Sequence, residues 1–223
     1  MSKSEFSLSK SSFAKARRLP REFYDRDPRR VGRELLGKLL IRKGARGKLL
    51  VGRIVEVEVY LGAKDPASHS FKGPTARNEI MFGPPGFAYV YFIYGNHYCL
   101  NVSCQPPGIA GAVLFRAVQP LEGMEDMAIA RHINMPSARD LRLLTSGPGR
   151  MAEAFGVTRQ RDNGKDFTSE KSDLIIAEPP ESDYRLPRIL ATKRIGITKA
   201  AEKRLRYVLA GNEFVSGPRH MSQ

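Results

Sequence analysis

The sequence predicts one α+β domain, and three observations support that prediction. Residues 49–60 alternate between valines and other side chains in the manner of a strand. Two apolar-rich runs flank a Gly-Asn pair at 95–96, which is typical of the turn in a β-hairpin. An Asp-Pro pair at 27–28 opens a stretch whose apolar residues have helical spacing. The length of 223 residues suits a single domain, and we find no internal repeat and no linker within residues 20–218.

Both ends of the chain are expected to lie outside this domain. Residues 1–19 are rich in serine and lysine and lack the apolar centre of a secretory signal, so we expect a disordered basic arm. Residues 219–223 are expected to form a short tail. The first helix is expected to begin after Asp27, which is a suitable N-cap. Its apolar face is expected to carry Val31, Leu35, Leu36 and Leu39.

The strand expected at residues 49–60 carries the first candidates for chemistry. Its valines point to one side, whereas the other side carries Ile54, Glu56, Glu58 and Tyr60. Such a polar face is usually the solvated side of an amphipathic strand. A glutamate that is partly desolvated beside an aromatic ring can instead act as a general base on water.

An aromatic hairpin is expected after a long loop. The loop spans residues 62–85 and includes His69, and its length is typical of a binding loop. Seven of the 19 aromatic residues fall between Phe82 and Tyr98, with Tyr94 expected at the tip of the hairpin. In a protein of net charge +14, an aromatic tip suggests a wedge between stacked bases. Aromatic strands also commonly form the core of a sheet, so both interpretations stay open.

Two strands carry polar residues in unusual places. Arg116 lies in the strand expected at 112–118, among apolar neighbours, where an unpaired charge is costly. We expect it either to reach a carboxylate such as Glu58 or to point to solvent from an edge strand. Asn101 lies in the second strand of the hairpin, where asparagine is disfavoured. It is interpreted as a hydrogen-bonding group that faces a pocket.

The rest of the chain is expected to mix short helices and strands. In order, the segments are a helix at 121–132, a turn at 145–150 that leads into a helix at 151–155, and strands at 173–177, 194–197 and 207–209. The backbone N–H groups of the turn at 145–150 could hold a phosphate.

The charge of the chain points to an anionic partner, and nucleic acid is the first candidate. Residues 184–210 carry eight lysines and arginines against one acid, Glu202. This basic stretch is expected either to follow a phosphate backbone or to be the solvated face of a helix. No apolar run approaches the roughly 20 residues of a membrane span. Two cysteines make no disulfide framework, which favours a reducing, intracellular location.

Several classes of chemistry lack their motifs. No pair of histidines has metal-ligand spacing and no Cys-x-x-Cys occurs, so no metal site is expected. Nucleotide-driven, dinucleotide-dependent and serine-hydrolase chemistry also lack their glycine-rich loops or nucleophile elbow. No cofactor is expected.

Ten separate segments resemble one family in the same order along the chain. They lie at 52–62, 65–70, 77–78, 81–82, 88–95, 100–102, 114–117, 144–148, 194–197 and 211–216. Together they are similar to the alkyladenine (3-methyladenine) DNA glycosylase family over about residues 20–216. The resemblance implies a mixed α/β domain around a curved antiparallel sheet, with a protruding aromatic hairpin. One departure is Asn96, where many members of the family have an apolar residue.

The resemblance implies a monofunctional enzyme of base-excision repair. It would flip alkylated or deaminated purines (3-methyladenine, 7-methylguanine, hypoxanthine) out of duplex DNA and hydrolyse the N-glycosidic bond. By analogy, Glu58 would deprotonate the attacking water and Arg116 would orient carboxylate and water.

The resemblance also implies how the base is held. Tyr60 and Tyr91 would stack on the flipped base, and His69 would pack and hydrogen-bond beside it. Tyr94 would fill the gap left in the DNA stack. Asn101 would exclude normal guanine, whose exocyclic amine would crowd it.

Partners and location follow from the same resemblance. We expect a monomer that binds double-stranded DNA containing damaged purines and no membrane, in a bacterial cytoplasm at the nucleoid or in a nucleus. The alternatives are a non-catalytic binder of damaged DNA or RNA with the same pocket, and an unrelated basic protein whose aromatic hairpin is core.

Overall fold

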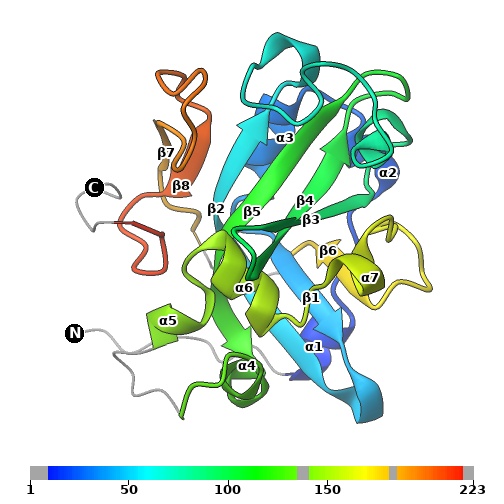
Figure 1. The fold of residues 1–223 in the computed structure, drawn as a ribbon. Helices are drawn as coiled ribbons and strands as arrows, with labels where there is room; N and C mark the ends of the chain where they lie inside the picture. The colour runs from blue at the N-terminus through cyan, green and yellow to red at the C-terminus, as the bar shows by residue number, and fades with distance from the viewer. Residues whose placement is uncertain (1–9, 135–140, 181–184, 218–223) are drawn as a thin grey trace.

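One antiparallel sheet organises the described residues, 10–134, 141–180 and 185–217, of the computed structural model (Figure 1). Its order is β3-β4-β5-β2-β1-β6, and β8 pairs with both β2 and β7. The strands are β1 (Leu39–Lys43), β2 (Leu49–Tyr60), β3 (Ala88–Ile93), β4 (His97–Cys104), β5 (Gly111–Glu122), β6 (Leu174–Ala177), β7 (Ile189–Thr192) and β8 (Arg206–Leu209). With helices on the same domain, the predicted α+β class is confirmed.

Short helices connect and cover the strands. The α-helices are α1 (Lys10–Ala14), α2 (Arg21–Tyr24), α3 (Pro28–Leu35), α4 (Met124–Ala130), α5 (Leu141–Thr145), α6 (Pro148–Ala154) and α7 (Arg159–Asp162). Three 3₁₀ turns, η1 (Ala45–Gly47), η2 (Gly62–Lys64) and η3 (Glu79–Phe82), lie in the loops. In Figure 1, α3 lies behind β2 and β5 while α6 lies in front of them. No helix in the described part of the chain is long and apolar enough to cross a membrane.

The long strand β2 is the centre of the sheet. Along one side it pairs with β5, with Glu58 opposite Leu114. Along the other side β1 pairs with the first half of β2 and β8 with the second half, where Glu58 lies opposite Arg206. Irregularities in the β2–β5 register around Glu56 mark a β-bulge. Glu56 and Glu58 are two positions apart, so their side chains share one face of β2.

Both faces of β2 are buried. The valine face packs against α3, where Gly32 permits close approach, because a Cβ atom there would lie 2.6 Å from Val59 Cγ2. On the opposite face Glu56 and Glu58 have no exposed surface. The interpretation of this face as solvated is therefore wrong, since the side chain of Arg206 and the N–H groups of Ile195 and Ser216 contact the two glutamates.

Several predicted elements are confirmed and others are shifted. The helix after Asp27 exists, and the Asp27 carboxylate accepts a hydrogen bond from the N–H of Arg29. Leu39 lies not in this helix but in β1, because Gly37, with φ of 87°, redirects the chain. The strands expected at 49–60, 112–118, 173–177 and 207–209 are present as β2, β5, β6 and β8.

Two boundaries and one strand were predicted wrongly. The helix expected from residue 121 begins at Met124, because β5 continues through Glu122 and Gly123 makes the turn with φ of 79°. The helix expected at 151–155 begins earlier, at Pro148, which is suited to a first helical position. Residues 194–197 form no strand, and the strand of this region is β7, just before them.

Part of the amino-terminal arm belongs to the folded domain. Residues 1–9 lie outside the described residues, as does the expected tail at 219–223. From Lys10 onward the chain forms α1, and Phe13 is buried against Leu39, Ile41 and Val51. The N–H of Leu19 donates to the carbonyl of Ile176. Residues 10–19 therefore differ from the expected disordered arm, because Phe13 and Leu19 supply apolar surface that the sheet buries.

An ion cluster fastens β1 to α7 and to the turn before β6. Arg42 is buried and donates from Nη1 and Nη2 to the carboxylate of Asp162, 2.8 Å each. Asp173 accepts from Arg42, Arg161 and Lys165. Burial alone would raise the pKa of Asp173, but the hydrogen bond from Lys165 and the charge of Arg42 outweigh it and lower the pKa from 3.8 to about 2.

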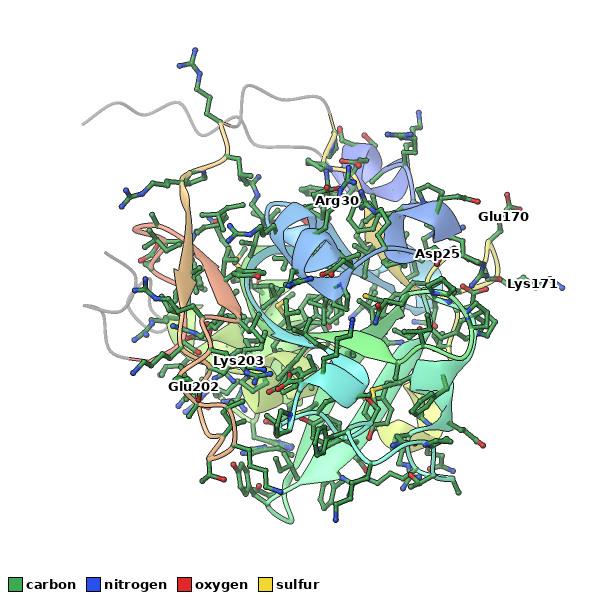
Figure 2. All side chains as sticks on the ribbon, turned by 90° about the horizontal axis from the view of Figure 1, so that it is seen from above. Asp25, Arg30, Glu170, Lys171, Glu202 and Lys203 are labelled. Carbon is green, nitrogen blue, oxygen red and sulfur yellow. The ribbon has the colours of Figure 1, made fainter. Side chains whose placement is uncertain are left out.

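Asp173 is expected to contribute to the acid sensitivity of the fold. Because its pKa is lower in the folded state, its stabilisation is present above about pH 4 and is lost as the pH falls towards about 2. We expect Asp173→Asn to flatten the loss of stability across this window, measured by urea unfolding at several pH values. The exposed Asp25 (Figure 2) provides the control variant, Asp25→Asn. If the free energy of unfolding fell equally steeply with falling pH in Asp173→Asn and in wild type, this assignment would be contradicted.

Candidate active site

All seven residues to which the family resemblance assigned a role line one cavity of about 420 Å³. They come from β2, the loop after it, the β3–β4 pair and β5: Glu58, Tyr60, His69, Tyr91, Tyr94, Asn101 and Arg116. The turn at residues 146–150 and the loop at 195–197 complete the wall. Among the described residues, no group of three or more histidines, cysteines or acids could hold a metal ion.

Glu58 is held by three donors in the wall of the cavity. Its Oε1 accepts from the N–H of Ile195 at 2.7 Å and is 3.1 Å from Nη1 of Arg116. Its Oε2 accepts from the hydroxyl of Tyr60 at 2.8 Å. These three donors fix the orientation of the carboxylate. Such a group, fixed in orientation and shielded from bulk solvent, can take a proton from a water molecule in the cavity.

Arg116 joins two buried glutamates. Its Nε donates to Glu56 Oε1 at 2.9 Å, and its Nη1 reaches Glu58. Of the two sequence-based interpretations, the one in which Arg116 reaches a carboxylate is therefore confirmed. Burial would lower the pKa of Arg116, but the charges of Glu58 and Glu56 outweigh it and raise the pKa. The guanidinium thus stays charged, and its planar fork fixes both carboxylates.

Tyr60 lies between Glu58 and a second buried ion pair. The guanidinium carbon of Arg194 is 4.7 Å from the centre of the Tyr60 ring. Arg194 also donates from both terminal nitrogens to Asp65, at 2.5 and 2.8 Å. Burial and the neighbouring charge of Glu58 raise the pKa of Tyr60. The phenol therefore stays protonated and serves as a donor to Glu58.

Aromatic rings form the opposite wall. Nδ1 of His69 is 3.0 Å from the hydroxyl of Tyr89, and the His69 ring meets Tyr91 edge-on with ring centres 4.6 Å apart. Partial burial lowers the pKa of His69, and the charge of Arg77 acts in the same direction. A neutral imidazole can donate from one nitrogen and accept at the other. This wall therefore offers both π-faces and a polar group to a planar guest.

Asn101 lies in the buried part of the cavity wall. Its Nδ2 donates to the carbonyl of Tyr89 at 3.0 Å, and 3% of the residue is exposed. The structure thus confirms that its side chain makes a hydrogen bond and that it borders a pocket. The poor suitability of asparagine for a strand is offset by this hydrogen bond between β4 and β3.

Tyr94 lies at the turn between β3 and β4. These strands pair antiparallel up to Ile93 and His97. The two turn residues with positive φ are Tyr94 (55°) and Gly95 (75°), so the turn is centred one residue earlier than the Gly-Asn pair. Tyr94 is 78% exposed, which excludes core packing for this residue, whereas Tyr89 in β3 is buried in the core.

Residues around Glu56 were missed by sequence reasoning. Glu56 Oε1 accepts from Nε of Arg206 at 2.6 Å, and its Oε2 accepts from the N–H of Ser216 at 2.6 Å. The contact between the N–H of Ile195 and Glu58 was also missed. A backbone donor leaves no trace in residue type, and the alternation in β2 pointed only to a shared face for the two glutamates.

The basic stretch at 184–210 is neither uniform nor helical. In the described part of it, Arg194 and Arg206 are buried in ion pairs with acids. Exposed cations remain at Arg185, Arg188, Lys193, Lys199 and Arg204, and Figure 2 shows Lys203 on the loop that leads into β8. The interpretation as a helix face is wrong, because the described residues of this stretch form β7, β8 and loops.

Comparisons with known proteins show the family of the chain. Residues 22–213 match the family model described as methylpurine-DNA glycosylase (MPG). A protein of Koribacter versatilis is 58% identical over 214 residues, covering 96% of this chain and all of its own length. One of Rhodopseudomonas palustris is 45% identical over 203 residues, covering 90% of this chain and 88% of its own. One of Methanocella arvoryzae is 44% identical over 188 residues, covering 84% and 88%. All three are named as candidate 3-methyladenine DNA glycosylases. The chain belongs to the methylpurine-DNA glycosylase family.

Proposed function

We propose that this protein is a monofunctional DNA glycosylase of base-excision repair. Its substrates would be alkylated or deaminated purines in duplex DNA, namely 3-methyladenine, 7-methylguanine and hypoxanthine, and its product an abasic site. The observation that carries the proposal is the oriented Glu58 carboxylate in the wall of an aromatic cavity, held by Arg116, Tyr60 and a backbone N–H. Family membership and the names of the relatives support the same activity.

The reaction needs a base for water and room for a flipped purine. Glu58 takes a proton from a water molecule, whose oxygen forms a bond to C1′ as the bond from C1′ to the purine nitrogen breaks. A 3-methyladenine or 7-methylguanine base is already cationic, so its leaving group is good and it is attracted to aromatic faces. Arg116 orients the carboxylate, and holding the water and the base in a fixed geometry lowers the barrier further.

Recognition of the base is assigned to the walls of the cavity. Tyr60 and Tyr91 stack on the flipped purine, and His69 packs beside it and hydrogen-bonds to its edge. Asn101 is a steric and polar gate against guanine. The position of its side chain is fixed by the bond to the Tyr89 carbonyl, so it cannot easily move aside for an exocyclic amine.

Tyr94 is assigned to the gap that flipping leaves in the DNA stack. It is exposed at a protruding turn beside the mouth of the cavity, with its hydroxyl 3.7 Å from where a Cβ atom of Gly196 would lie. The exposed cations of the basic stretch supply contacts to the phosphates of the DNA backbone. A single domain with one cavity of this kind can act as a monomer on double-stranded DNA.

Tyr94→Ala is expected to weaken binding to a lesion-containing duplex by about 1–3 kcal/mol, roughly fivefold to 150-fold, because the stacking surface is lost. The melting temperature should stay close to that of wild type, since the side chain is 78% exposed. Fluorescence anisotropy and a thermal melt measure the two effects. Phe92→Ala, an exposed aromatic of the same strand pair outside the cavity, is the control. A fall in melting temperature that corresponds to a loss of several kcal/mol in the free energy of unfolding would instead support a role of Tyr94 in the core.

The experiment that tests the function separates binding from release. Wild-type protein is incubated in excess with duplexes that carry 7-methylguanine or hypoxanthine and with an undamaged duplex, and free purine is measured by chromatography beside a binding assay. Release of the damaged purine alone is the expected result. Tight lesion binding without release of either base would favour the non-catalytic binder of damaged DNA or RNA.

A further inference from the structure

A second carboxylate lies behind the site without bordering the cavity. Glu56 has no exposed surface and accepts four hydrogen bonds. Two come from guanidinium groups, Arg116 Nε at 2.9 Å and Arg206 Nε at 2.6 Å. Two come from Ser216, whose N–H donates at 2.6 Å and whose hydroxyl donates at 2.8 Å. Four donors hold the Glu56 carboxylate in one position.

Arg206 and Ser216 are themselves fixed from distant parts of the fold. Arg206 is fully buried, and its terminal nitrogens donate to the hydroxyl of Thr192 and to the carbonyl of Ser216, at 2.9 Å each. The hydroxyl of Ser216 lies 3.4 Å from Nη2 of Arg116. Of the two Arg116 nitrogens that do not face Glu58, Nε is therefore held by Glu56, which Arg206 holds in turn. The other, Nη2, contacts Ser216.

The four charged groups balance. Glu56 and Glu58 carry two negative charges, and Arg116 and Arg206 carry two positive charges. Arg116 is shared between the two glutamates, whereas Arg206 contacts only Glu56 of the two. The electrostatic effect of Arg116 on Glu58 therefore depends on how far Arg206 neutralises the charge of Glu56.

We propose that Glu56, Arg206 and Ser216 are positioning residues for the excision reaction, because they aim Arg116 at Glu58 and set the balance of charge around the catalytic carboxylate. This inference rests on the proposed function and deepens it. None of the three borders the cavity, so none contacts the base or the attacking water. They act through their contacts with Arg116 and through their charges.

We call Glu56, Arg206, Ser216 and Arg116 together the relay. Removing a negative or a positive charge from the relay is expected to move the protonation of Glu58 in opposite directions. Glu56→Gln removes a negative charge and leaves two guanidinium groups for Glu58, which favours its ionised form and makes it a weaker base. Arg206→Met leaves one guanidinium for two carboxylates, which favours the protonated form of Glu58. The other groups that face Glu58 stay the same in both variants: Tyr60, Cys99, Arg116 and Arg194.

The test is the pH dependence of single-turnover release of 7-methylguanine from a duplex. Its acid limb reports the ionisation of the general base. We expect the midpoint of that limb to fall by about one pH unit in Glu56→Gln and to rise by about one unit in Arg206→Met. Arg206→Lys, which keeps the charge, should return the midpoint close to that of wild type. The plateau rate should be lower than wild type in both charge variants.

A buried ion pair elsewhere supplies the matched control. Asp162→Asn removes a fully buried negative charge from Arg42, outside the cavity, and should lower stability without moving the midpoint. Unmoved midpoints in folded Glu56→Gln and Arg206→Met, or midpoints that shift in the same direction in both, would overturn the proposal.

Two further measurements separate this proposal from folding and from the proposed function. Ser216→Ala keeps all four charges and should fold, yet it should lower the plateau rate several-fold because Glu56 loses a donor and Arg116 a contact. A wild-type plateau rate in this variant would contradict the relay even if both charge variants failed to fold. Titration of the ¹³C-labelled Glu58 carboxyl by NMR in the free protein needs no substrate. Opposite shifts there, with no purine released by wild type, would refute the proposed function and retain the relay as a charge network. Absent shifts, with purine released, would refute the relay alone.

Discussion

Replacing Glu58 by glutamine is expected to preserve binding of a lesion-containing duplex and to slow release of the base by at least about a hundredfold, the scale of general-base loss. Glutamine keeps the shape of the side chain and can still accept from Arg116 and the N–H of Ile195. It cannot take a proton from water. Single-turnover release of 7-methylguanine, with binding followed by anisotropy, measures both quantities.

The control for this variant is a glutamate away from the cavity. Glu34 pairs with Arg26 and Arg30 at the surface, and Glu34→Gln should release base at the wild-type rate. Excision by Glu58→Gln at the wild-type rate would rule out Glu58 as the base. Loss of lesion binding together with excision would indicate that the carboxylate organises the cavity instead of acting on water.

Arg116→Leu is expected to have the largest effect on stability as well as a severe effect on excision. It leaves Glu58 buried without its arginine partner and Glu56 with Arg206 alone. Breaking a buried ion pair by removing one partner costs about 3–5 kcal/mol. Chemical unfolding should show that loss, and base release should fall because a buried carboxylate without a cation tends to take up a proton.

Arg116→Lys distinguishes the charge of this residue from its geometry. Lysine supplies a point charge and lacks the planar fork that contacts both glutamates. We expect much of the stability to return while excision stays slow. Wild-type stability in Arg116→Leu would show that the ion pairs around Glu56 and Glu58 contribute little to the fold.

The parts of the site that are local in sequence could be predicted. Alternation in β2 placed Glu58 and Tyr60 on one face, and the charge of Arg116 among apolar neighbours indicated a buried partner. The turn signal located the β3–β4 connection to within one residue. Each inference needed only a few neighbouring residues, because strand periodicity and the cost of an unpaired charge act over that range.

The parts that depend on distant pairing could not be predicted. Whether the polar face of β2 is wet or buried depends on β8, and Arg206 contacts Glu56 across 150 positions of sequence. Residues 194–197 have the β-branched composition of a strand, yet Gly196 adopts φ of 76° and the segment bends over Glu58. Tertiary contacts decide both outcomes, and no local pattern encodes them.

The measurement that tests the role of water most directly is the single-turnover reaction of wild-type protein with duplexes bearing 7-methylguanine or hypoxanthine, run in parallel without and with borohydride. Without borohydride we expect free damaged purine and a strand that breaks only after alkali treatment. With borohydride, which would reduce an imine between protein and DNA, we expect no protein trapped on DNA, because water is the nucleophile. Binding without release of either purine, or a borohydride-trapped protein–DNA adduct, would contradict a glycosylase that acts through water activated by Glu58.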